Sequence, residues 1–319
     1  MNHHRHTQCF ASYSVVNLLR SLCRPRAAFF SAALMTLVSF SAQSASSGVS
    51  FSAIKTAQSA GSLEAMAVAG GEWTTIRKLA HTAILVKHPQ GDLLYDTGIG
   101  TEVAEQMKAF NIFDQQLFKV EEHVPAIEQL SRESYSLTQL NAVVVGHMHW
   151  DHVSALEDFM GVPVWTNEAA LAEARAGKPP GFVQSQFDDP NINWQFKALN
   201  SGEYMGFKLS LDVYGDGSVV LVDISGHADG HQGMFINLQD GRRYFFIGDT
   251  TWTLKGIEQN RSRPVFVQWL TGVDKDVEKN AAVIDHVHKL TQKFPDLVVV
   301  PAHDERVLET LPRYPEFSH

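Results

Sequence analysis

The sequence predicts a single-domain α/β (α+β) fold in which two packed β-sheets lie between outer helices. Strand-like segments fall into two groups along the chain, and each group is followed by a helical pattern. Histidine and aspartate residues also stand directly after several of the predicted strands. Two sheets that bury one face against each other and cover the other face with helices account for this order of elements.

The first group of strands lies in the N-terminal half. Residues 76–87 and 92–95 are predicted strands separated by the turn His88-Pro89-Gln90-Gly91. Residues 124–140 are predicted to form a helix that leads into a short apolar strand over 142–145. This strand ends at a glycine and is followed by a further helical pattern.

The second group lies in the C-terminal half. Residues 208–224 are β-rich around the hairpin turn Gly215-Asp216-Gly217, and the pattern continues through 233–238 and 243–247. A helix with one apolar face is predicted after these strands from apolar residues at spacings of four, three and four, namely Val283, Val287, Leu290 and Phe294.

A cluster of potential metal ligands follows the strand over 142–145. His147, His149, Asp151 and His152 form the pattern H-x-H-x-D-H. Imidazole nitrogens and carboxylate oxygens are ligands that zinc accepts, so this short segment offers four candidates. A chance match is expected in roughly a few chains per thousand, and the structural context therefore matters. A turn between a strand and a helix is a common place for functional residues.

Three further candidates stand just past the ends of other predicted strands. His227 follows the apolar run 219–224, Asp249 follows 244–247, and His303 follows 297–302. Strand ends bring segments that are distant in sequence to one edge of a sheet. The seven residues are therefore expected to converge on one site.

These residues resemble the ligand pattern of the metallo-β-lactamase superfamily of binuclear metallohydrolases, over about Trp73 to His303. The resemblance implies a four-layer αββα sandwich that holds two zinc ions per chain, with iron, manganese or cobalt as other divalent possibilities. It assigns the first metal to His147, His149 and His227, the second metal to Asp151, His152 and His303, and the bridging position to Asp249.

Two more positions carry the resemblance or depart from it. The segment 93–98 matches the family's early strand and D-T-G turn, which implies that Asp96 buttresses the metal site. Gly146 stands where many members have Thr, which puts a supporting hydrogen bond in doubt. Among the other histidines, His81 has no partner pattern and is predicted to be an ordinary structural or surface residue. His231 lies four residues after His227 and is predicted to be a structural histidine, with support of a metal ligand as the alternative.

The segments 215–231 and 248–252 resemble N-acyl homoserine lactonases and related esterases. This resemblance implies that a metal-bridging hydroxide attacks the carbonyl of a lactone or ester. Asp151 is the candidate catalytic residue, because it can hold a metal and also orient or accept a proton from the nucleophile. Trp252 is a candidate substrate-binding residue at the place of a lactonase Tyr, and its indole N–H can donate but cannot titrate.

Several other activities stay open on this scaffold. Phosphotriester or phosphodiester cleavage needs the same metal pair, and β-lactam hydrolysis is a further alternative. An iron-dependent dioxygenase or diiron oxidoreductase represents a different class, because carboxylate-rich sites also suit iron. A non-catalytic binding protein is disfavoured, since all seven ligands are present. Elemental analysis and a substrate panel separate these alternatives.

The loop region between His152 and His227 contains a predicted helix over 167–176 and four aromatic residues that are candidates for the wall of a substrate pocket. These aromatic residues are Phe182, Phe187, Trp194 and Phe196. Ordinary packing under a surface loop is the equally weighted alternative.

The N-terminal segment has the pattern of an export signal. Arg20, Arg24 and Arg26 precede the apolar stretch 27–42, and small residues follow it, so residues 1–45 are predicted to be a signal peptide with a long leading segment. Cleavage is expected between Ala42 and Ser47, and it gives a periplasmic or secreted protein; an uncleaved membrane anchor is the alternative. Residues 46–71 are predicted to be a linker or N-terminal arm, and residues 72–319 the hydrolase domain.

Removal of this leader changes the composition. Both cysteines, Cys9 and Cys23, lie within it, so no thiolate can bind metal in the mature chain. The leader also contains four arginines and no acidic residue, and its loss changes the formal net charge from −9 to −13. Such an acidic protein is a poor ligand for nucleic acid or for an anionic membrane. The expected partner is a small-molecule substrate, and the oligomeric state stays open.

Overall fold

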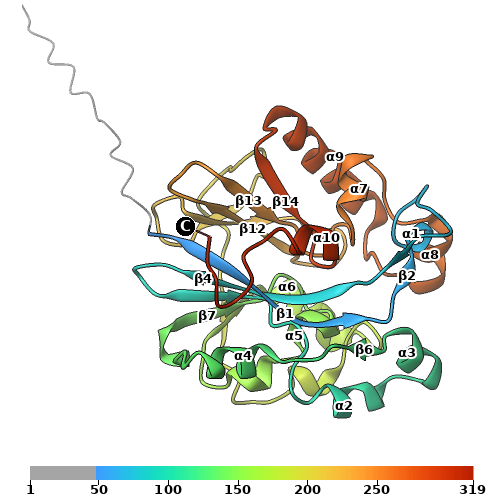
Figure 1. Cartoon of the computed structure of the whole chain (residues 1–319), viewed down its shortest axis with the longest axis horizontal. Coiled ribbons are helices and arrows are strands. Elements are labelled where there is room, and N and C mark those ends of the chain that lie inside the picture. Colours follow the sequence, from blue (N-terminus) through green and yellow to red (C-terminus); the bar gives the residue numbers. More distant parts are fainter. Residues whose placement is uncertain (1–47, 319) are drawn as a thin grey trace, which may run out of the picture. The chain divides into compact units, whose positions relative to one another are not determined.

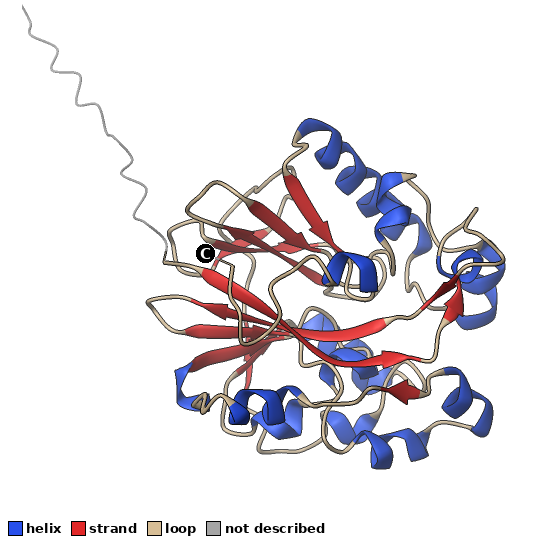
Figure 2. Ribbon diagram, viewed as in Figure 1, coloured by secondary structure: helices blue, strands red, loops and turns tan. Residues whose placement is uncertain are grey.

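A computed structural model describes residues 48–318, in which two β-sheets face each other and helices cover their outer faces (Figures 1 and 2). This arrangement confirms the predicted four-layer αββα single domain. The predicted signal peptide over 1–45 lies outside the described residues. Among the helices of residues 48–318, none combines the length and hydropathy needed to cross a membrane.

The first sheet has seven strands in the order β6-β1-β4-β5-β7-β8-β9. Its strands are β1 (Ser50–Ser59), β4 (Ala80–Lys87), β5 (Asp92–Tyr95), β6 (Val120–Glu121), β7 (Leu140–Val144), β8 (Val164–Thr166) and β9 (Trp194–Phe196). The pairs β5–β7, β7–β8 and β8–β9 are parallel, whereas β1–β4, β1–β6 and β4–β5 are antiparallel.

The second sheet has five strands in chain order. Its strands are β10 (Ser210–Asp212), β11 (Val219–Asp223), β12 (Gln232–Asn237), β13 (Arg243–Phe246) and β14 (Leu297–Val300). All pairs are antiparallel except β13–β14, which is parallel. A small separate pair consists of β2 (Ser62–Leu63) and β3 (Ile76–Arg77).

Ten α-helices surround these sheets in the described residues. They are α1 (Glu64–Ala67), α2 (Val103–Gln106), α3 (Ile112–Leu117), α4 (Ala126–Arg132), α5 (Trp150–Val153), α6 (Glu168–Ala176), α7 (Leu254–Glu258), α8 (Val265–Thr271), α9 (Val277–Lys293) and α10 (Glu305–Leu308). Figure 1 shows α9 and α7 outside the second sheet, and α4 on the opposite side of the molecule, outside the first.

Alternating side chains divide the buried core into layers. On β4, Ile84 and Val86 point to the second sheet, where they meet residues such as Leu221 of β11, whereas Leu85 points to the helices on the outer face. On the far side, α9 buries Ile284, Val287 and Leu290 against the second sheet, as the predicted apolar face requires. These layers fix the edges where the strands end.

The prediction of a linker or arm over 46–71 is wrong for the part that the structure describes. Residues 50–59 form β1, which pairs with β4 and is buried along nearly its whole length. The small residues that suggested an arm allow close packing. Thr56 Oγ1 accepts from the Ile99 N–H at 2.9 Å, and a Cβ on Gly98 would lie 2.3 Å from the same oxygen.

The predicted helix over 124–140 is also too long. It ends after α4, because Ser134 adopts a positive φ of 56°, and a short 3-10 turn over 137–139 leads into β7. The predicted helix over 167–176 is confirmed, with Asn167 as its N-cap accepting from the Ala170 N–H at 2.9 Å.

A buried ion pair fastens the segment after β1 to the domain. Glu64 is 2% exposed and contacts Arg77 Nη2 at 2.7 Å and Lys255 Nζ at 2.6 Å. Burial acts to raise the pKa of Glu64, but hydrogen bonds from Lys255, the Glu72 N–H and Arg77 lower it from 4.5 to about 2. A carboxylate with a lowered pKa stabilises the fold above its unfolded pKa, and this contribution disappears as the pH falls toward 2.

We therefore expect Glu64→Gln to lower the free energy of unfolding by about 1 to 3 kcal/mol at pH 7. The difference between wild type and variant should shrink between pH 4.5 and pH 2. Urea unfolding at several pH values measures it. Glu309→Gln is the control, because the Glu309–Arg313 pair is exposed and 3.9 Å apart, and its loss should cost under about 0.5 kcal/mol. A pH-independent difference for Glu64→Gln would contradict this interpretation.

Candidate metal centre

Four strand ends bring the seven predicted ligands together. His147 and His149 lie in the turn after β7, and Asp151 and His152 lie on α5. The other three ligands follow β11, β13 and β14, and they are His227, Asp249 and His303. The parallel pairs β5–β7 and β13–β14 place their carboxyl ends at the same side of the two sheets, which is why segments so distant in sequence meet here.

The first group of donor atoms comes from three histidines. His149 Nδ1 lies 3.1 Å from His147 Nε2 and 2.9 Å from His227 Nε2. His227 Nε2 also lies 3.6 Å from Asp249 Oδ2. Ligands held at about 2.0–2.1 Å from one tetrahedral metal are about 3.3 Å apart, so these spacings fit a shared ion.

The second group contains two histidines and two aspartates. Asp249 Oδ1 lies 3.2 Å from His152 Nε2 and 2.9 Å from His303 Nε2. His303 Nε2 also lies 3.3 Å from Asp151 Oδ2. The two oxygens of Asp249 therefore face different groups, an arrangement in which one carboxylate could hold a metal on each side.

Each group has histidines whose outer nitrogen is held by a fixed partner. His227 Nδ1 lies 2.8 Å from Asp274 Oδ1, and His152 Nδ1 lies 2.7 Å from Asp96 Oδ2. His303 Nδ1 donates to the Ala80 carbonyl at 2.7 Å. When Nδ1 carries the proton, Nε2 presents a lone pair to the centre, which is the tautomer that a metal needs. The expected buttressing by Asp96 is thus observed.

The two groups differ in their electrostatics. Burial lowers the pKa of His147 far below its usual range and that of His149 to about 3, and neighbouring histidines add to the effect. Burial also opposes a charge on His152, yet the carboxylates of Asp96, Asp151 and Asp249 raise its pKa well above 6.5. The first group therefore favours neutral imidazoles, whereas the carboxylates of the second group favour a positive charge at its centre.

The residues present fit a pair of divalent metal ions. Nitrogen and oxygen donors converge here, and His152 Nε2 and Asp249 Oδ1 are buried and 3.2 Å apart without a well-aligned hydrogen bond between them. Buried polar atoms are normally satisfied, and a cation held between these two atoms would satisfy both. The donor set of imidazole and carboxylate suits zinc and also admits iron, manganese or cobalt.

Trp252 lies directly beside the bridging aspartate. Its indole N–H donates to Asp249 Oδ2 at 3.0 Å, and the Arg263 guanidinium lies 4.4 Å from its ring. The predicted role of Trp252 in binding substrate stays a prediction. In the structure its single donor is already engaged by a ligand carboxylate.

Three residues of the centre have no signal in the sequence pattern. His81 on β4 has Nδ1 3.1 Å from Asp151 Oδ2, although it was expected to be an ordinary histidine. Asp274 and Arg263 form a buried pair at 2.6 Å, and Arg263 also donates to the Asp249 carbonyl at 2.5 Å. These residues lie outside any motif, and only the fold brings them to the ligands.

Gly146 is explained by its surroundings. A Cβ at this position would lie 2.6 Å from the Tyr95 hydroxyl, which donates to the Gln232 carbonyl at 2.6 Å. The Gly146 N–H donates to Asp96 Oδ1 at 2.6 Å. The backbone thus supplies a hydrogen bond next to the motif, and no side chain fits there. His231 is buried nearby, with its ring centroid 4.7 Å from that of His147.

Only one of the four loop aromatic residues contacts the ligands. The ring of Phe182 lies 4.9 Å from that of His149. Phe187 and Trp194 pack into the core beneath the first sheet, and Phe196 is 48% exposed. The predicted aromatic wall is therefore reduced to Phe182.

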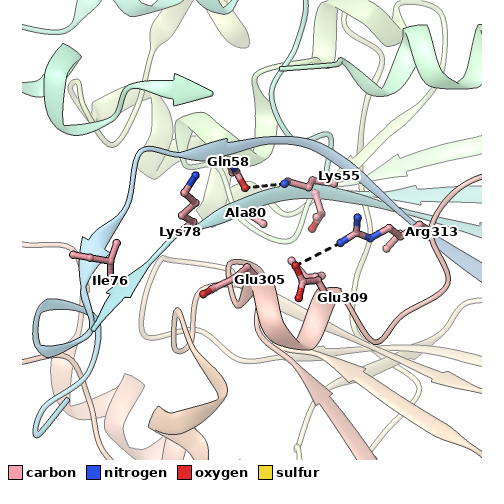
Figure 3. A pocket seen from close by; sticks show the side chains of 11 residues that line it. Lys55, Gln58, Ile76, Lys78, Ala80, Glu305, Glu309 and Arg313 are labelled. Carbon is pink, nitrogen blue, oxygen red and sulfur yellow. Dashed lines mark hydrogen bonds and ion pairs between the residues drawn. The ribbon is translucent and has the colours of Figure 1, made fainter. Parts of the chain in front are cut away.

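A separate cavity of about 360 Å³ lies between β1, β4 and α10 (Figure 3). Among the described residues that line it there is no metal ligand. Its polar groups largely pair with one another, as Lys55 does with Gln58 at 2.8 Å and Arg313 with Glu309 at 3.9 Å. Ala80, whose carbonyl holds His303, forms part of its wall, so the cavity backs onto the metal centre.

The fold and the paired donor groups define a metal-dependent hydrolase. A sequence model of the metallo-beta-lactamase superfamily matches residues 76–303. The chain belongs to this superfamily.

Similar proteins include lactonases and a probable metallo-hydrolase, in agreement with membership of this superfamily. The N-acyl homoserine lactonase AttM of Rhizobium radiobacter is 26% identical over 241 residues, which cover 73% of this chain and 85% of the relative. A probable metallo-hydrolase of Mycobacterium tuberculosis is 27% identical over 246 residues, covering 72% and 76%. The structure of an N-acyl homoserine lactone hydrolase with bound product superposes with a TM-score of 0.66 at 18% identity, covering 84% of this chain and 98% of that one. This structural similarity, at 18% sequence identity, shows that the two proteins share a fold.

Proposed function

We propose that this protein is an exported dizinc hydrolase that opens the ring of a lactone, with N-acyl homoserine lactones as the first candidate substrates. The observation that carries the proposal is that the two oxygens of Asp249 face two different groups of donor atoms. This arrangement fits two neighbouring metal positions that share one carboxylate. The substrate class is supported by relatives that are described as N-acyl homoserine lactonases and span most of this chain.

Metal ions held by these residues would supply a hydroxide nucleophile at neutral pH and would polarise the attacked carbonyl. The residues of this chain fix its geometry. Asp249 keeps the two positions close together, and the Asp96, Asp274 and Ala80 contacts hold three histidines in the required tautomer. Phe182 beside His149 offers an apolar surface for the substrate next to the first position.

Asp151 is the group that we assign to proton handling. Its Oδ2 faces His303, and it is 9% exposed. Burial opposes its charge, but His152, His81 and His303 hold the pKa of this carboxyl well below its usual range. Asp151 is therefore anionic at neutral pH and can orient the proton of the nucleophile.

A hydrolysis panel on the zinc-loaded mature protein tests the substrate class. The panel contains N-acyl homoserine lactones, aryl esters, organophosphates and β-lactams. Ring opening of lactones with kcat/KM well above that for the other classes supports the proposal. Turnover confined to β-lactams or to phosphoesters contradicts it.

Metal content and export need separate measurements. Elemental analysis should give close to two zinc ions per chain, whereas a single iron with oxygen uptake would indicate an oxygenase. Export is tested by expressing the full chain and sequencing the N-terminus of the protein found outside the cytoplasm. Cleavage between residues 42 and 47 is the expected result, and retention of an intact chain in the cytoplasm contradicts it.

A further inference from the structure

His81 lies at the metal centre although it is not one of the seven candidate ligands. It is the second residue of β4 and is only 7% exposed. Its neighbour Ala80 exchanges two hydrogen bonds with His303: the Ala80 N–H donates to the His303 carbonyl at 3.2 Å, and His303 Nδ1 donates to the Ala80 carbonyl at 2.7 Å. This double link fixes the start of β4 against the loop after β14 and sets the His81 and His303 rings 5.2 Å apart.

The atom that His81 contacts is significant. His81 Nδ1 lies 3.1 Å from Asp151 Oδ2, and His303 Nε2 lies 3.3 Å from the same oxygen. His303 Nε2 is one of the donor atoms of the second group, and Asp151 Oδ2 is the Asp151 oxygen that lies next to it. Asp151 Oδ2 is therefore the oxygen that faces the second metal position. One donor atom each from His81, Asp151 and His303 lie within 4.8 Å of one another.

This contact differs from the other contacts that support the centre. Asp96, Asp274 and the Ala80 carbonyl each bind the nitrogen of a histidine that is remote from the metal position. His81 instead meets the oxygen that faces this position. Spacings of 3.1 and 3.3 Å on either side of Asp151 Oδ2 match the separation of about 3.3 Å between ligands of one zinc ion.

We propose that His81 is an additional ligand of the second metal, binding through Nδ1 beside Asp151, His152, His303 and Asp249. This inference rests on the metal pair of the proposed function but not on the substrate. It gives the second position five protein donors from four separate segments, against four for the first.

The test is the structure and metal affinity of the zinc-loaded protein. In a crystal structure of the zinc-loaded wild type, we expect His81 Nδ1 about 2.0–2.1 Å from the second metal. His81→Gln should weaken the second dissociation constant at least about tenfold in a chelator competition, with the first constant unchanged. For His81→Gly, added imidazole should restore binding of the second zinc ion.

His88→Gln is the matched control. His88 directly follows β4, and it is also a buried histidine that contacts an aspartate, with Nε2 3.0 Å from Asp216 Oδ2. Asp216 lies in the turn between β10 and β11 and belongs to neither group of donor atoms. This variant should keep both dissociation constants.

Two results overturn the inference. The first is a zinc-loaded structure in which Nδ1 stays hydrogen-bonded to Asp151 and more than about 3 Å from the metal. The second is a His81→Gln protein that binds two zinc ions as tightly as the wild type, which would leave the dinuclear centre intact. A wild type that binds only one metal would remove the dinuclear centre as well.

Discussion

Asp249→Ala is expected to lower kcat/KM roughly a thousandfold or more and to reduce bound metal from two ions per chain to one at most. Asp249 is the residue on which both donor groups depend, since Oδ1 faces His152 and His303 while Oδ2 faces His227. Its removal takes away the carboxylate that the two positions share, so each position loses an anionic ligand.

The fold should survive this change. Within residues 48–318, the polar contacts of the Asp249 side chain go to candidate ligands and Trp252, whereas its backbone carbonyl is the group that accepts from Arg263. Metal content is measured by elemental analysis after dialysis, and initial rates are measured with the best lactone of the panel. Circular dichroism confirms that the variant is folded.

Asp216→Ala is the control for this experiment. Asp216 also pairs with a buried histidine, His88, at 3.0 Å, but it lies in a hairpin turn without a metal ligand. It should retain two metals and nearly full activity. If Asp249→Ala kept two metals and normal turnover, the bridging role would be wrong.

The convergence of the seven candidate ligands could be predicted because their signal is local. Each follows a short apolar run that ends in a turn, and runs of this kind form buried strands whether or not their partners are known. The ends of such strands meet in space once the sheets form. The prediction of these seven residues therefore did not depend on knowing how the strands pair.

The supporting residues could not be predicted, because their role depends on register and packing. His81 lies on a strand with many buried neighbours, and only the contact between β4 and α5 brings it to Asp151. Asp274 lies in a loop between α8 and α9, and its position follows from the ion pair with Arg263. Neither the contact of His81 with Asp151 nor that of Asp274 with Arg263 follows from the spacing of these residues in the sequence.

The error over residues 46–71 has a similar physical origin. Composition is a guide to disorder because chains poor in large apolar residues bury too little surface. β1 is an exception, since Phe51 and Ile54 face the two layers of the core while its small residues sit against the close turn at Gly98. A strand of small residues is predictable only when its neighbours are known.

Asp274→Ala is expected to have the largest effect on stability, about 3 to 5 kcal/mol in the metal-free protein. The Asp274 and Arg263 side chains are 0% and 1% exposed and 2.6 Å apart. Removing the carboxylate leaves a buried guanidinium without its charged partner, and the desolvation of that cation is then uncompensated. Urea unfolding of protein treated with a chelator measures this effect without a contribution from metal.

The same substitution should weaken the first metal position by about 10- to 100-fold. Asp274 Oδ1 lies 2.8 Å from His227 Nδ1 and selects the tautomer that leaves Nε2 free. The carboxylate itself is anionic, because burial is outweighed by the charge of Arg263 and the contact with His227, which hold its pKa well below the usual range. Zinc competition assays should show the loss at the first position and little change at the second.

A double-mutant cycle separates the two roles of Asp274. Arg263→Met combined with Asp274→Ala should be more stable than the sum of the single changes predicts, because both buried charges are then absent. Its first metal should still bind weakly, since His227 has lost its partner in both proteins. The exposed Asp285→Ala variant, which loses a pair with Lys289 at 2.6 Å, should cost under about 1 kcal/mol. Recovery of metal affinity in the double variant would show that Arg263, rather than the bond to His227, governs the first position.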